Sequence, residues 1–135
     1  MNILPATITK ISSADSILLL DVEVEGTAMS ALLTDNPYSA SWLKEGNQVS
    51  VVFKETEVSL MKDFSGMISL RNRLLCRVTA VEKGKLIGLV HLLFKNRHIT
   101  SAITTRSIEG MNIQPGDEVT AMIKANEVSV VRASG

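Results

Sequence analysis

The 135-residue chain has little of what most catalytic and metal sites are built from. It contains one cysteine, Cys76, and two histidines, His91 and His98. An internal disulfide is therefore impossible, and a cation site made of cysteine and histidine is not expected. The sequence has no Gly-rich phosphate loop, no HExxH motif and no Ser or Cys motif with a suitable histidine partner. We therefore predict a protein that is not an enzyme and that holds no metal cation.

Aromatic residues and net charge are also scarce. Phe, Trp and Tyr together make up 4% of the chain, and 14 Lys and Arg residues balance 14 Asp and Glu residues. Nucleic-acid-binding modules stack bases on aromatic side chains and attract phosphates with a basic groove. Nucleic acid is therefore not an expected partner. Because 45% of the residues are hydrophobic, the chain should fold around an aliphatic core.

Long hydrophobic runs are missing as well. The first ten residues lack the basic start and apolar core of a signal peptide. The longest apolar run, residues 86–94, is far shorter than the roughly 20 residues that a membrane-spanning helix needs. These features predict a cytoplasmic protein with no membrane insertion.

The sequence does contain two related halves. Residues 2–60 align with residues 72–130 at a constant offset of 70 without a gap, and twelve of the 59 pairs are identical. The identical pairs include Asn2/Asn72, Leu4/Leu74, Thr34/Thr104, Gly46/Gly116 and Lys54/Lys124. Asp, Ser and Gly in residues 61–67 indicate a short linker between the halves. We therefore divide the chain into a first repeat, residues 1–65, and a second repeat, residues 66–135.

Each repeat has the pattern of a small β domain. In the second repeat, apolar residues alternate along 74–81, and turn residues fill 82–85 and 114–117. Further strands are expected at 86–94, 98–104, 118–124 and 127–132, with one helical turn at 107–111. Five short strands with a helical turn after the third are typical of an OB barrel. The predicted fold class is all-β: two tandem OB-like five-stranded barrels, each with a short helical turn.

The small size of each repeat and the distribution of its apolar residues favour an oligomer. A module of about 65 residues buries little surface by itself. Residues 86–94 are apolar on both strand faces, which indicates that both faces are covered. The cover is either the other barrel of the same chain or a second subunit. We favour a subunit interface, and hence a homodimer or homotrimer.

The segment that opens the second repeat suits an oxyanion. In an extended chain Ser69 and Arg71 project to one side, where a hydroxyl and a guanidinium together make a fitting pair of donors for a tetrahedral oxyanion. The alternative is that Arg71 is a surface charge and Asn72 a turn residue. These residues alone do not decide between the two interpretations.

An ordered series of motifs favours the oxyanion. The series is SLRN at 69–72, EKG at 82–84, ITSAIT at 99–104 and VTAMIKA at 119–125. It closely resembles the molbindins, which are small molybdate-binding modules of the Mop/TOBE type with the signatures SARN, EKGAVNAEV, ITAIIT and VTALIKAS. The resemblance covers residues 68–132 and is weaker in the first repeat. It implies a tandem molbindin, similar to stand-alone molybdate carriers and to the C-terminal regulatory region of molybdate importer ATPases.

The resemblance also implies a set of oxyanion ligands. Matched residue by residue, the family's ligands fall on Ser69, Arg71, Asn72, Thr104, Lys124, Ala125 and Asn126, with the backbone at the last two as further donors. Thr34 and Lys54 of the first repeat are secondary candidates. In the family these groups meet across a subunit interface. The chain departs from the family at residues 86–88, Leu-Ile-Gly in place of Val-Asn-Ala, and at Asn126 in place of serine.

The chemistry of molybdate agrees with these residues. Molybdate is a dianion with four acceptor oxygens, and Arg71 and Lys124 would nearly neutralise it through charge-assisted hydrogen bonds. A pocket that holds only donors would disfavour hydrogenphosphate, whose proton needs an acceptor. Tungstate should bind as molybdate does. The expected function is non-catalytic molybdate or tungstate binding for molybdenum storage, homeostasis or sensing.

Two other functions fit less well. One is a structural module whose oligomerisation regulates a molybdate transporter ATPase or a regulator. The other is an OB module that binds nucleic acid, which the low aromatic content opposes.

The first repeat is expected to lack a site of its own. The offset of 70 places Met1 where the second repeat has Arg71, and Glu55 where it has Ala125. A carboxylate at this point would repel a dianion. We therefore predict about one molybdate per chain.

Overall fold

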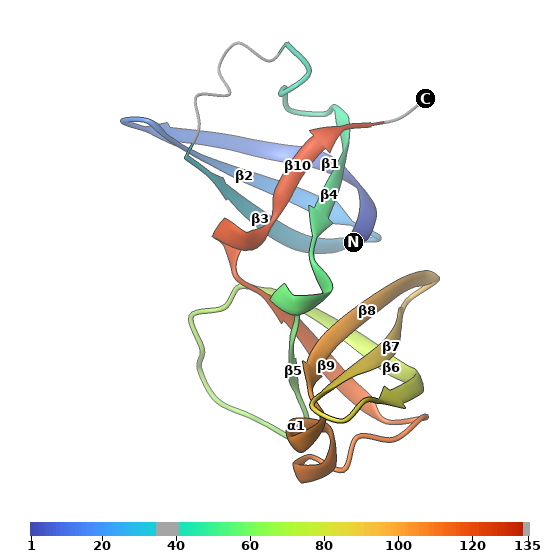
Figure 1. The fold of residues 1–135 in the computed structure, drawn as a ribbon. Coiled ribbons are helices and arrows are strands. Elements are labelled where there is room, and N and C mark those ends of the chain that lie inside the picture. The colour runs from blue at the N-terminus through green and yellow to red at the C-terminus, as the bar shows by residue number, and fades with distance from the viewer. Residues whose placement is uncertain (35–40, 134–135) are drawn as a thin grey trace.

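The computed structural model describes residues 1–34 and 41–133 of the chain. Within these residues the fold is all-β, as predicted, and consists of two five-stranded antiparallel sheets (Figure 1). The first sheet has the order β10(Ser129–Arg132), β4(Gln48–Phe53), β1(Asn2–Ala14), β2(Ile17–Val24), β3(Thr27–Leu33). The second has the order β5(Ser59–Met61), β9(Glu118–Ile123), β6(Asn72–Lys83), β7(Ile87–Phe94), β8(Arg97–Thr104).

The two repeats exchange their last strands. Strand β5 ends the first repeat but pairs with β9, and Leu60 lies opposite Ala121. Strand β10 ends the second repeat but pairs with β4, and Val130 lies opposite Val51. In Figure 1 the red β10 accordingly lies beside the green β4, in the half of the molecule that holds the N-terminus. Each five-stranded sheet is therefore built from both repeats.

Each sheet curls toward a barrel. The edge strands β10 and β3 of the first sheet approach each other, as do the edge strands β5 and β8 of the second. Register shifts at Ile8/Lys10 in β1 and at Val78/Ala80 in β6 interrupt the pairing at equivalent positions, and such bulges increase strand twist. This architecture agrees with the predicted pair of OB-like units.

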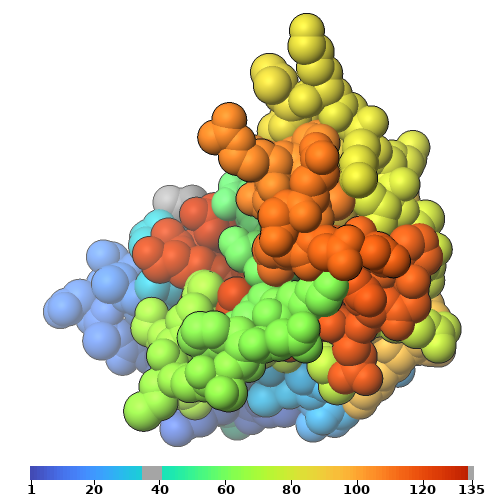
Figure 2. Space-filling view, turned by 90° about the horizontal axis from the view of Figure 1, so that it is seen from below, coloured from blue at the N-terminus to red at the C-terminus, as the bar shows by residue number. Residues whose placement is uncertain are grey.

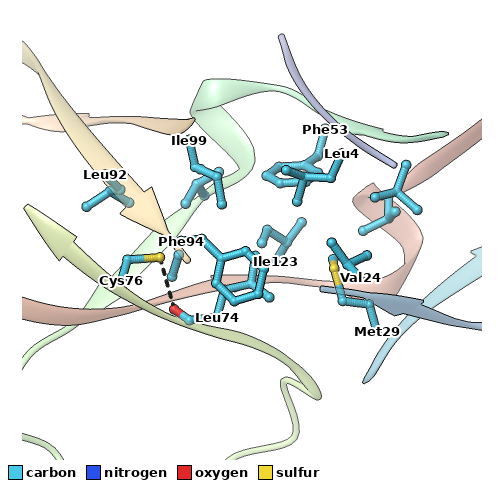
Figure 3. Packing of buried hydrophobic residues seen from close by; sticks show 14 of the residues in the cluster. Leu4, Val24, Met29, Phe53, Leu74, Cys76, Leu92, Phe94, Ile99 and Ile123 are labelled. Atoms are coloured by element: carbon cyan, nitrogen blue, oxygen red, sulfur yellow. Dashed lines mark hydrogen bonds between the residues drawn. The ribbon is translucent and has the colours of Figure 1, made fainter. Parts of the chain in front are cut away.

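One aliphatic core joins the two units. Along β1 and β6 alternate residues are buried, because successive side chains point to opposite faces of a strand. Figure 3 shows Leu4 and Phe53 of the first unit packed near Phe94 and Ile123 of the second. Burial of one such side chain stabilises the fold by about 1.5–3 kcal/mol. The repeats therefore depend on each other for a complete core.

Reciprocal hydrogen bonds reinforce the contact between the repeats. Asn2 Nδ2 donates to the carbonyl of Thr100 at 2.9 Å, and Asn2 Oδ1 accepts from its N–H at 2.8 Å. Asn72 makes the equivalent pair of bonds with Ser30. Because residues 2 and 72 are one offset apart, the two contacts are related by an approximate two-fold symmetry. Both asparagine side chains are buried.

Several local predictions are confirmed and others are corrected. The predicted helical turn is α1(Thr105–Gly110). Its counterpart in the first repeat would fall at 35–40, outside the described residues. The predicted strand 127–132 is shorter, because residues 125–127 form the 3-10 turn η3(Ala125–Glu127), equivalent to η2(Glu55–Glu57). Among the described residues, no helix has the length and apolarity needed to cross a membrane.

Candidate functional site

A cavity of about 980 Å³ lies between the two repeats. The second repeat supplies two short segments to its wall, residues 68–71 and 124–126, and the first repeat supplies residues of β2, β3 and the position after β3. The lining residues are Leu19, Asp21, Ser30, Leu32, Thr34, Ile68, Ser69, Leu70, Arg71, Lys124, Ala125 and Asn126. The structure therefore gathers Ser69, Arg71, Lys124, Ala125 and Asn126, five of the residues predicted from the sequence.

The segment that carries Ser69 and Arg71 is fixed at its end. Asn72 begins strand β6 and is bonded to Ser30 of β3, which ties the end of the segment to the first repeat. Arg73 Nε donates to the carbonyl of Leu70 at 3.0 Å. Ser69 and Arg71 themselves precede β6 and are exposed. The hydroxyl and the guanidinium therefore lie on an anchored loop and not within a strand.

Lys124 and its neighbours lie where β9 ends. Lys124 has an extended backbone and caps the turn η3. Within this turn the N–H of Glu127 donates to the carbonyl of Lys124 at 2.9 Å. The N–H groups of Ala125 and Asn126 open the turn and so have no acceptor within it. The ammonium of Lys124 and two backbone donors therefore come from one short stretch.

The first repeat contributes the opposite wall. Thr34 directly follows β3, and its exposed side chain lines the same cavity as Arg71 and Lys124. On the neighbouring strands, Asp21 lies opposite Ser30, and the Ser30 hydroxyl donates to Asp21 Oδ1 at 2.8 Å. Asp21 and Ser30 were not among the predicted site residues. The motifs that revealed the site lie in the second repeat, so they carried no signal for these two residues.

Three other predicted site residues lie elsewhere in the single chain. Thr104 lines a separate cavity of about 750 Å³ beside α1, where its hydroxyl accepts from the N–H of Ser107 and so caps the helix. Lys54 lines a third cavity, together with Asn126. Asn72 is 1% exposed, and both polar atoms of its side chain are bonded to Ser30. Of the two secondary candidates, Thr34 lines the cavity of Arg71 and Lys54 does not.

The charges around the cavity are mixed. Arg71 and Lys124 are cationic, whereas Asp21 is a carboxylate on the same wall as Ser30. The expectation of a pocket that holds only donors is therefore wrong, because Asp21 is an acceptor. Within residues 1–34 and 41–133, no group of three or more His, Cys, Asp or Glu side chains is placed to hold a metal ion. Burial raises the pKa of the Cys76 thiol to about 12, so it stays protonated at neutral pH.

The cavity is open in a single chain. Its volume greatly exceeds that of one tetrahedral oxyanion, and four of its lining residues, Leu19, Leu32, Ile68 and Leu70, are aliphatic and only half-buried. Figure 2 shows the green segment that joins the repeats on the surface, between blue residues of the first repeat and orange residues of the second. The residues that follow the joining segment are therefore accessible from outside the chain.

Comparison with known proteins gives a consistent set of matches. The TOBE domain family matches residues 68–130. Molybdenum-pterin-binding protein 3 of Clostridium pasteurianum is 38% identical over 65 residues, which cover 47% of this chain and 96% of that protein. The molybdenum import ATP-binding protein ModC of Brucella abortus (strain 2308) is 34% identical over 97 residues, 71% of this chain. That match accounts for 26% of ModC, so the chain corresponds to about a quarter of this relative.

A solved structure matches nearly the whole fold. The cytoplasmic molybdate-binding protein ModG, in a crystal form with molybdate bound, superposes with a TM-score of 0.92 at 27% sequence identity. The superposition covers 98% of this chain and 96% of that one. The agreement therefore extends over both repeats.

Proposed function

The chain belongs to the TOBE-domain family of molbindins, and on this premise we propose that it binds molybdate, without catalysis, in the cavity between its two repeats. The observation that carries the proposal is the convergence of Ser69, Arg71 and Lys124 on one cavity with Thr34. Tungstate, which has the same charge and shape, is expected to bind as well. The likeness to a cytoplasmic molybdate-binding protein supports a cytoplasmic location.

The donor set fits a tetrahedral dianion. Arg71 offers up to five N–H donors and Lys124 three, and hydrogen bonds from charged donors are about twice as strong as neutral ones. Ser69 and Thr34 add hydroxyls, and the turn at Ala125 adds backbone N–H groups. In this arrangement donors approach the anion from both repeats. The oxyanion would thus link the first repeat to the second.

We also infer that the site is completed by further copies of the chain. The cavity is larger than its anion, and the aliphatic side chains on its wall are only half-covered. On β7, one face is buried in the core, whereas Leu89, His91 and Leu93 on the other face are half-exposed. A homo-oligomer would cover such surfaces. Sedimentation velocity with and without molybdate tests this assembly.

Calorimetric titration tests the binding proposal. Molybdate and tungstate should each bind saturably with a Kd below about 100 μM, and sulfate and phosphate should bind more weakly. Sulfate is smaller and is expected to fit loosely. The absence of saturable molybdate binding below that concentration would favour a purely structural role as an oligomerisation module.

A further inference from the structure

We propose that Asp21 limits the affinity of this site for a doubly charged oxyanion. The inference rests on the proposed function and deepens it. Asp21 lies on β2 and lines the same cavity as Arg71 and Lys124. It is the acidic residue among the twelve that form the wall.

The carboxylate is held in place on the cavity wall. Its Oδ1 accepts a hydrogen bond of 2.8 Å from the Ser30 hydroxyl, and the two residues lie opposite each other in the β2–β3 pairing. The main chain of Ser30 is in turn bonded to Asn72, the residue next to Arg71, at 2.7 and 2.8 Å. Asp21 therefore shares one hydrogen-bonded framework with the segment that carries the cation.

The strand pairing itself does not require a carboxylate. At an offset of 70, the second repeat has His91 opposite Thr100 where the first has Asp21 opposite Ser30. The β7–β8 hairpin forms the same antiparallel register without an acid at this position. The role of Asp21 is thus better sought in the cavity than in the sheet.

Several charged and polar groups lie around Asp21. Lys10 of β1 lies opposite it in the strand pairing, Ser30 of β3 donates to it, and Arg71 and Lys124 share its cavity from the second repeat. A bound dianion would bring two further negative charges into the same cavity, where the Asp21 carboxylate repels it.

This repulsion has a consequence for affinity. The carboxylate offsets one of the two cavity cations, so the dianion binds less tightly than the donor set alone would allow. The site would therefore hold its anion in exchangeable form.

Calorimetric titration of Asp21→Asn with molybdate tests the proposal. The amide keeps the size of the side chain and an oxygen that accepts from Ser30. The variant should bind molybdate about tenfold more tightly than the wild type at neutral pH, because one like charge is removed. The matched control is Glu23→Gln, which removes the same charge two residues further along β2, where the side chain does not line the cavity.

If the wild type binds and Asp21→Asn binds no more tightly than Glu23→Gln, the inference is wrong and the proposed function stands. If Asp21→Asn binds molybdate and the wild type does not, the inference is supported. If neither protein binds molybdate, the proposed function and the inference both fail.

Discussion

The side-chain amide of Asn72 forms hydrogen bonds with both main-chain polar groups of Ser30. Its Nδ2 donates to the Ser30 carbonyl at 2.8 Å, and its Oδ1 accepts from the Ser30 N–H at 2.7 Å. Asn2 makes the same two bonds with Thr100. This symmetry means that each repeat uses the asparagine at the start of its first strand to hold the third strand of the other.

Replacement of either asparagine should therefore weaken the fold. Asn72→Ala leaves the Ser30 main chain without partners in a region that is largely buried, and we expect a loss of about 1–3 kcal/mol in the free energy of unfolding. Asn2→Ala should cost a similar amount. Urea denaturation measures both, with Asn96→Ala in an exposed turn as the control. Equal stabilities for Asn72→Ala and the control would contradict this role.

The two threonines at equivalent positions should have different roles. Thr34→Val removes a neutral donor from the cavity of Arg71 and should weaken molybdate binding by about fivefold, as expected for one hydrogen bond. Thr104→Val should leave the affinity unchanged but destabilise the protein by about 1 kcal/mol, because Thr104 caps α1. Titration and thermal unfolding of both variants separate the two effects. A loss of affinity in Thr104→Val alone would reverse this assignment.

Loss of either cavity cation should weaken binding sharply. In Arg71→Ala or Lys124→Ala one charge-assisted donor disappears and the dianion is left under-compensated, which should cost about 2–4 kcal/mol of binding free energy. The matched control is Arg77→Ala, which removes an exposed cation from β6 at a position that does not line the cavity. Affinities within about threefold of the wild type for both cavity variants would exclude this site.

The stoichiometry should be about one molybdate per chain. The residues equivalent to Thr34 and Lys124 at the offset of 70 are Thr104 and Lys54, and these two line separate cavities. Glu55 also lies where the second repeat has Ala125, and its charge would oppose an anion. Equilibrium dialysis with labelled molybdate counts the sites. Two equivalent tight sites per chain would disprove the assignment of a single intact cavity.

The two turns η2 and η3 predict a dependence of stability on pH. Burial and the neighbouring carboxyl of Glu127 raise the pKa of Glu57 above its ordinary value of 4.5. An acid with a raised pKa in the folded state contributes stability below its unfolded-state pKa, and this contribution is lost as the pH rises through the folded-state pKa. Glu57→Gln should therefore have a higher Tm than the wild type at neutral pH.

Thermal unfolding from pH 4 to pH 8 at low salt checks this prediction. The difference in Tm should disappear toward pH 4, where the wild-type carboxyl is protonated, and it should shrink in high salt. Glu23→Gln, which changes an exposed glutamate on β2, is the control for a general effect of charge. A Tm difference that is constant across the pH range would contradict a repulsive Glu57–Glu127 pair.

The sequence by itself determined the local elements. Alternation of apolar residues follows from the geometry of a strand and located β6 and β8, and a continuous apolar run located β7, each to within about two residues. The turn residues at 114–117 and the constant offset of 70 likewise depend only on neighbours in the chain or on comparison of its halves. The motifs of the second repeat identified Ser69, Arg71 and Lys124, which the fold brings to one cavity.

The tertiary structure alone decided which repeat completes which sheet. The sequence of a strand does not identify its pairing partner when two similar strands are available. The equivalent strands β4 and β9 offer β10 similar pairing edges. Packing of the shared core selects the exchanged arrangement, in which Thr34 lines the cavity of Arg71. The same exchange places Asp21 on the cavity wall, because contact between segments distant in sequence depends on packing and not on local pattern.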